Sequence, residues 1–141
     1  MRLLVLDTNV LISALLWPGM PTRLIDLASE GEIQLFTSRA LLDELSETLL
    51  RPKFIRAVAA TGLSAATLVK HYQRLAQSVT ARKLTQQICR DADDDAILAC
   101  ALAAHAEMIV TGDKDLLVLH PFRGVDILNP AEAVRRVQQH G

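Results

Sequence analysis

The sequence has few aromatic residues, few cysteines and no long apolar run. Aromatics make up 4% of the 141 residues, which leaves few rings for stacking bases and argues against a single-strand binding platform. Cys89 and Cys100 form no C-x-x-C pair, and we interpret both as reduced packing residues. No run of 18 apolar residues exists, and Asp7 interrupts the apolar N-terminus. We therefore expect no membrane span, no signal peptide and a cytoplasmic location.

Two catalytic motifs are also missing from the sequence, and acidic residues are missing from one long stretch of it. The sequence contains no glycine-rich phosphate loop and no Gly-x-Ser-x-Gly, so nucleophilic serine catalysis has no support. Residues 48–90 contain no Asp or Glu but eight Lys or Arg, whereas residues 91–115 contain seven acids and Lys114 alone. The formal net charge is only −1. This segregation suits a protein that holds a polyanion on one surface and metal ions on another.

The length and hydrophobic pattern predict one α/β domain over residues 1–141. Hydrophobic residues make up 50% and mean hydropathy is +0.24, enough for a sizeable core. Apolar strands are expected near 3–6, 33–36, 108–111 and 125–128, with an ambiguous segment at 78–84 where Val79 could mark a short strand. Helices are expected near 8–16, 22–29, 38–50, 52–60, 64–76, 93–104 and 130–138. This alternation predicts a three-layer α/β/α sandwich with a mostly parallel sheet.

Acidic residues lie where the expected strands end. Asp7 closes the first strand and Asp113 follows the 108–111 strand, so both should face the rim of the sheet where ligands bind. Asp93, Asp94 and Asp95 begin the helix that leads into that strand, and Glu44 lies one to two turns into the helix after the second. Converging carboxylates need a cation, and all-oxygen ligation selects Mg²⁺, Mn²⁺ or Ca²⁺ over zinc.

Each acid also has an ordinary structural interpretation. Asp7 and Asp113 could be turn or cap residues, and the three adjacent aspartates could stabilise a helix N-terminus. Three exceed what capping requires, so at least one is expected in a metal site. Helical glutamates are usually solvated, and on spacing alone Glu47 is as plausible as Glu44.

Four sequence blocks, in order, resemble the motifs of PIN-domain ribonucleases. They are Leu6-Asp7-Thr8-Asn9-Val10-Leu11-Ile12-Ser13, Ser38-Arg39-Ala40-Leu41-Leu42-Asp43-Glu44-Leu45, Asp91-Ala92-Asp93-Asp94-Asp95-Ala96-Ile97-Leu98-Ala99-Cys100-Ala101 and Ile109-Val110-Thr111-Gly112-Asp113-Lys114-Asp115-Leu116. Within that family the chain is similar to the VapC-like toxins of toxin–antitoxin pairs. The resemblance implies a Rossmann-like fold, a Mg²⁺- or Mn²⁺-dependent endoribonuclease, an antitoxin partner and a homodimer.

The resemblance also implies the roles of individual residues. The family's four acids, which would bind the metal and carry catalysis, map to Asp7, Glu44, Asp95 and Asp113, with Asp93 and Asp94 as adjacent alternatives to Asp95. The positions expected to support the site are Thr8, Asn9, Asp93, Asp94, Thr111 and Asp115. Separately from the resemblance, which gives no motif in residues 50–90, the basic residues that could position RNA phosphates are Arg39, Arg51, Lys53, Arg82, Lys83 and Arg90.

Two other functions compete with the nuclease. One is an acidic-pocket module that binds RNA or protein with little cleavage. The other is a phosphatase or receiver-like phosphoryl-transfer domain, which also places an Asp after its first strand. The phosphatase pattern requires a second Asp two residues later, where this sequence has Asn9, so the nuclease is preferred.

Overall fold

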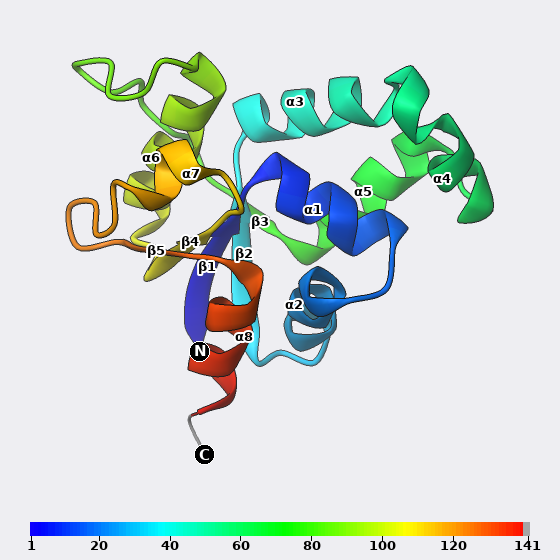
Figure 1. Cartoon of the computed structure of the whole chain (residues 1–141), viewed down its shortest axis with the longest axis horizontal. Helices are drawn as coiled ribbons and strands as arrows, with labels where there is room; N and C mark the ends of the chain where they lie inside the picture. Colours follow the sequence, from blue (N-terminus) through cyan, green and yellow to red (C-terminus); the bar gives the residue numbers. More distant parts are fainter. Residues whose placement is uncertain (140–141) are drawn as a thin grey trace.

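The chain folds around a five-stranded parallel sheet. A computed structural model describes residues 1–139 and places the strands in the order β3-β2-β1-β4-β5 (Figure 1). The strands are β1 (Arg2–Leu6), β2 (Ile33–Thr37), β3 (Gln77–Ser78), β4 (Met108–Val110) and β5 (Asp126–Leu128). All four pairings are parallel, so the carboxyl ends of the strands share one rim.

Alternation of side chains along the strands divides the core between the two faces of the sheet. Leu4 and Leu6 belong to one cluster of buried residues, whereas Val5 between them belongs to another. The first cluster includes residues of α1 (Thr8–Leu16), α2 (Met20–Ser29), α3 (Arg39–Leu49), α5 (Ala65–Leu75) and α8 (Pro130–Gln138). The second includes residues of α6 (Ala92–Ala104) and α7 (Lys114–Leu117). The expected α/β/α sandwich is confirmed.

Three elements differ from the expected pattern. Helix α2 begins at Met20, before the expected start, because Pro21 is tolerated in a first helical turn that needs no amide donor there. The ambiguous segment forms a strand of only two residues, Gln77 and Ser78, and the Val79 amide donates to the Thr37 carbonyl at 2.9 Å. Helix α7, only four residues long, was not expected. A 3-10 turn (Pro52–Phe54) and α4 (Ile55–Ala60) occupy the expected 52–60 helix.

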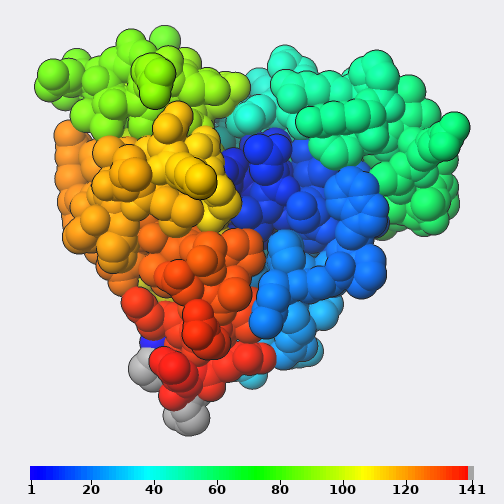
Figure 2. Space-filling view, in the orientation of Figure 1, coloured from blue at the N-terminus to red at the C-terminus, as the bar shows by residue number. Residues whose placement is uncertain are grey.

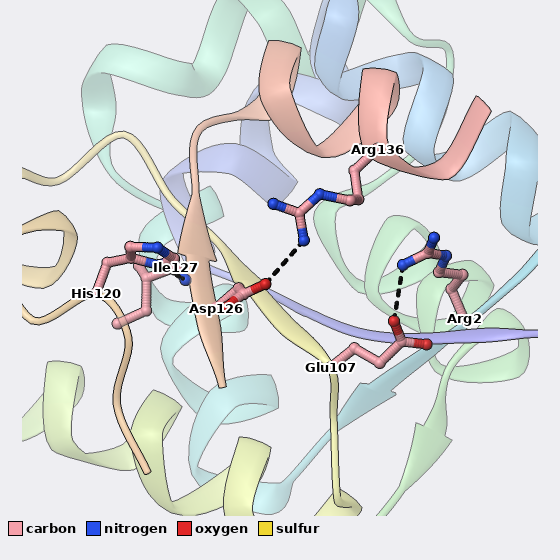
Figure 3. Close-up of polar contacts among 6 residues, drawn as sticks. All are labelled: Arg2, Glu107, His120, Asp126, Ile127 and Arg136. Atoms are coloured by element: carbon pink, nitrogen blue, oxygen red, sulfur yellow. Dashed lines mark hydrogen bonds and ion pairs between the residues drawn. The ribbon is translucent and has the colours of Figure 1, made fainter. Parts of the chain in front are cut away.

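Ion pairs hold the sheet at the end opposite to the carboxyl rim (Figure 3). Arg2, at the start of β1, pairs with Glu107 at 2.8 Å, and Arg136 of α8 pairs with Asp126 of β5 at 2.8 Å. Such partly exposed pairs contribute about 0–1 kcal/mol each. The Ile127 amide donates to His120 Nδ1 at 2.9 Å, which fastens the loop before β5. These contacts are structural.

No single helix within residues 1–139 is long and apolar enough to cross a membrane. Helices α1 and α2 meet the length and composition criteria only as a pair, and they are bent by 84° at the break between them.

Candidate functional site

Asp7 and Asp113 meet at the carboxyl rim through Thr111. Because β1 and β4 are parallel neighbours, with Leu6 opposite Val110, the residues that follow them are side by side. The Thr111 hydroxyl donates to Asp7 Oδ2 at 2.5 Å, and the Asp113 amide donates to Thr111 Oγ1 at 3.0 Å. Thr111 is fully buried. It therefore fixes the spacing of the two acidic strand ends.

Asp7 is a buried carboxyl group. It lies at the N-cap position of α1 and is 6% exposed. Burial raises its pKa, and the charge of Asp113 raises it further, whereas the Thr111 hydroxyl and the amides of Asn9 and Thr8 lower it. A negative charge on Asp7 is therefore stabilised by the hydroxyl and amide donors and destabilised by burial and by the charge of Asp113.

Glu44 approaches Asp7 from α3. Burial raises the Glu44 pKa, as do the charges of Asp93, Asp7 and Asp91, while the Thr8 hydroxyl at the start of α1 lowers it. Glu44 Oε2 is buried, and it has no hydrogen-bond partner among residues 1–139. A buried carboxylate oxygen without a donor costs free energy unless a cation or another donor reaches it.

The acidic start of α6 contributes Asp94 to the rim. Asp94 is 9% exposed and shares the buried helix face with Ile97, Leu98 and Ala101, three, four and seven residues further on. Burial, followed by the charges of Asp113, Asp91, Asp7 and Asp115, raises the Asp94 pKa to about 7. The carboxyl group of Asp94 therefore lies near Asp7 and Asp113.

Asp95, the expected third ligand, is occupied elsewhere. Its Oδ1 accepts the Cys89 amide at 2.7 Å and its Oδ2 accepts the Ile88 amide at 3.1 Å. One residue corresponds to about 100° of rotation around a helix, so Asp95 points to the segment before α6 while Asp94 points to the sheet. The structure thus places Asp7 close enough to Glu44, Asp94 and Asp113 for their charges to act on one another, whereas the Asp95 carboxylate is hydrogen-bonded to the segment before α6.

The remaining acids lie at the edge of the group. Asp91 caps α6 by accepting the Asp93 amide at 2.9 Å, and Asp93 itself is exposed. The Asp115 amide donates to Asp113 Oδ1 at 2.9 Å, and the Asp115 side chain is exposed. Asp113 consequently serves as the N-cap of α7. The sequence carries a signal for α7, because an Asp at the N-cap with a second acid in the first turn is typical of a helix start.

The acidic group has the oxygen donors of a divalent-cation site, although the side chains are not already arranged around one point. Within residues 1–139, no three His, Cys, Asp or Glu side chains are placed to hold one metal ion. Two carboxylates about 4 Å apart repel by roughly 4 kcal/mol at an effective dielectric of about 20. The unpaired Glu44 oxygen and the raised pKa of Asp94 show where a cation would offset this repulsion. Hard ions such as Mg²⁺ and Mn²⁺ suit this donor set.

The basic residues lie on two arms beside the acidic rim. Figure 2 shows residues 38–62 on one side and residues 80–92 on the other, with α1 between them. Arg39, Arg51 and Lys53 belong to the first arm, where Arg39 pairs with Asp43 at 3.4 Å and Lys53 Nζ lies 5.0 Å from the Phe54 ring centre. Arg82, Lys83 and Arg90 belong to the second arm and are exposed.

Comparison with known proteins identifies the family of this chain. A family model described as "PIN domain" matches residues 3–115. An uncharacterized protein of Methanocaldococcus jannaschii is 36% identical over 117 residues, which cover 82% of this chain and 73% of that protein.

Two solved structures share the fold. The structure described as VapBC2 from Rickettsia felis, bound to a DNA fragment from its promoter, matches with a TM-score of 0.61 and 16% identity. The structure of FitAcB from Neisseria gonorrhoeae matches with a TM-score of 0.52 and 19% identity. Each match covers 91% of this chain and 98% of the other. Since the family model spans most of the sequence, the chain belongs to the PIN domain family.

Proposed function

We propose that this PIN domain is a Mg²⁺- or Mn²⁺-dependent endoribonuclease whose metal ligands are Asp7, Glu44, Asp94 and Asp113. The observation that carries the proposal is the buried, unpartnered Glu44 oxygen near Asp7 and the acids at the start of α6. Asp94 replaces the expected Asp95, because the Asp95 carboxylate already accepts two backbone amides. The nuclease class follows from the family.

The four acids and Thr111 have different roles in the proposed site. A divalent ion bound by the four acids would supply an activated water and neutralise charge that develops on the phosphate. Thr111 holds Asp7 and Asp113 at a fixed separation through its hydroxyl. Asp94, whose pKa is raised to about 7, is suited to exchange a proton near neutral pH when no cation is present, and burial raises the pKa of Glu44 as well.

The experiment is cleavage of mixed-sequence RNA with Mn²⁺, with Mg²⁺ and with EDTA. We expect cleavage only with a divalent ion, and Asp7→Asn should reduce it at least 100-fold while the thermal melt still shows a folded protein. Asp26→Asn on the exposed face of α2 removes the same charge and is the matched control. Sequencing the cut ends would define the cleavage sites. Full activity of Asp7→Asn, or equal cleavage in EDTA, would contradict the assignment.

We further propose that the protein acts as the toxin of a toxin–antitoxin pair and self-associates as a dimer. The fold it shares with the VapBC2 and FitAcB structures supports this role. Large apolar side chains are exposed at Trp17, Met20, Leu50 and Ile55. The Trp17 ring centre lies 6.2 Å from that of Phe54, next to Ile55, so exposed apolar side chains of two segments meet there, as they do at protein contact surfaces. Growth arrest on expression, relieved by a small protein encoded beside it, would test the pairing. Light scattering of the purified chain would test the dimer.

A further inference from the structure

A cavity of about 390 Å³ lies beside the acidic rim, between the start of α3, residues 81–87 and α6. This volume falls within the range of small-ligand sites. Six of the twelve residues that line it are aliphatic, namely Ala40, Ala81, Leu84, Ala92, Ala96 and Ala99, and the other six are polar or charged. The aliphatic side chains offer a contact surface to a flat apolar ligand group, and the polar ones offer partners to its charged and hydrogen-bonding atoms.

Two basic side chains line this cavity and also a neighbouring one. Arg82 and Lys83 line it with exposed side chains, and both also line a second cavity of about 470 Å³, which Arg123 borders. Leu84 is shared by the two cavities and packs against the core cluster that contains α6. The cationic segment, residues 81–87, thus places Arg82 and Lys83 at two cavities that also share Ala99 of α6.

The first cavity adjoins the proposed catalytic acids. Asp93 lines it, and the charge of Asp93 acts on Glu44. Ala40 lines it from α3 and lies four residues before Glu44, one helical turn away on the same face. A ligand in the cavity would therefore be next to any phosphate held at the acids.

Asp95 positions the cationic segment over the cavity. Its two carboxylate oxygens accept the amides of Cys89 and Ile88 at 2.7 and 3.1 Å, and Asp95 itself lines the cavity. Within the segment itself, the Gln87 side-chain amide donates to the Cys89 carbonyl at 2.8 Å. The two bonds to Asp95 therefore attach to α6 a segment that has little regular structure of its own.

We propose that this cavity binds one nucleotide of single-stranded RNA adjacent to the cleaved bond, with its base against the aliphatic wall and its phosphate against Arg82 and Lys83. The inference rests on the proposed function and deepens it. Unstacked bases in single strands can enter such a pocket, whereas those of a duplex cannot. Asp95 is a positioning residue for this site.

Charge favours RNA over a protein as the occupant. The segment belongs to the acid-free stretch 48–90, and its cations lie beside acids that would repel a phosphate unless a divalent ion were bound. A polyanion that reaches both the acids and the cavity needs cations near the acids, and Arg82 and Lys83 line the same cavity as Asp93.

The test measures affinity for a fluorescent single-stranded RNA of mixed sequence in Ca²⁺, by anisotropy at several salt concentrations. Arg82→Ala/Lys83→Ala should weaken binding roughly tenfold and reduce the slope of log affinity against log salt by about 0.7, since the one phosphate held by these two residues contributes about 0.7 on a single strand. Lys70→Ala/Arg74→Ala on the exposed face of α5 removes the same charge and should have a much smaller effect. Equal losses in the two double variants would overturn the proposal.

A second variant fills the cavity without changing charge. Ala40→Leu adds aliphatic volume without a ring that could stack on a base. It should weaken RNA binding about five- to tenfold, roughly 1 kcal/mol, with the salt slope unchanged, whereas Ala59→Leu at an exposed position of α4 should not. Unchanged RNA affinity in Ala40→Leu would overturn the proposal and favour a protein as the occupant. Cleavage by the wild-type chain in Mn²⁺ is scored separately, so a failure of the nuclease assignment is distinguishable from a failure of the cavity assignment.

The role of Asp95 has its own readout. Asp95→Ala should speed hydrogen exchange at the Ile88 and Cys89 amides and weaken RNA binding together, while Asp95→Asn, which keeps one acceptor, should restore part of both. Weaker RNA binding with unchanged exchange at these amides would refute a positioning role.

Discussion

Replacing Asp94 by Asn should make the metal-free protein more stable at alkaline pH. Burial and the neighbouring charges raise the Asp94 pKa from its ordinary value of 3.8 to about 7 in the folded state. The folded protein therefore binds a proton more tightly than the unfolded chain does. The stability that this proton provides is fully present below about pH 4 and is lost as pH rises through about 7.

The size of the effect follows from the two pKa values. At about 1.4 kcal/mol for each tenfold change in proton affinity, the difference corresponds to about 4 kcal/mol as an upper limit. Relaxation and water reduce it, so we expect about 2–4 kcal/mol at pH 8. For a chain of this length that corresponds to a rise in Tm of roughly 6–14 °C. Because Asn stays neutral, the gain should vanish near pH 4.

The assay is thermal and urea unfolding of the wild type and Asp94→Asn in EDTA, at pH 4 and pH 8. The control is Asp93→Asn, which removes the same charge from the adjacent, exposed residue. It should change stability by no more than about 0.5 kcal/mol. Adding Mn²⁺ should stabilise the wild type more than Asp94→Asn, since a ligand that binds only the folded state raises stability with its affinity. The reasoning is refuted if Asp94→Asn is less stable than the wild type at pH 8 in EDTA.

Three further predictions concern the site and the core. Thr111→Val should destabilise the protein by about 1–3 kcal/mol, because the hydrogen bond to buried Asp7 is lost, and should weaken Mn²⁺ binding in calorimetry; unchanged values of both would count against its bridging role. Glu44→Gln should lower kcat for RNA at least 100-fold, whereas Asp43→Asn, whose side chain is 63% exposed, should stay within about twofold; similar losses in both would sink the ligand assignment. Leu45→Ala, in a fully buried position, should cost about 2–5 kcal/mol in urea unfolding, and a cost under about 1 kcal/mol would contradict the packing of α3.

The sequence by itself determined the fold class and most of the acidic rim. Continuous apolar runs predicted β1 and β4, and an Asp directly after a parallel strand must lie near the carboxyl rim. Asp7 and Asp113 could therefore be located from local patterns alone. Glu44 needed the family resemblance, because Glu47 has a similar spacing and only packing of α3 against α1 separates the buried oxygen of Glu44 from the exposed side chain of Glu47.

The tertiary structure decided which of the adjacent aspartates faces the acids. Asp94 and Asp95 differ by one position in a helix, and the sequence fits either, since Ala96 to Ala104 are apolar on nearly every side. The choice depends on the rotation of α6 against the sheet and on the Ile88 and Cys89 amides that capture Asp95. The Thr111 bridge and the cavity under Arg82 and Lys83 likewise join segments far apart in the chain. Local patterns specify which residues can form an element, whereas contacts between elements specify which side chains meet.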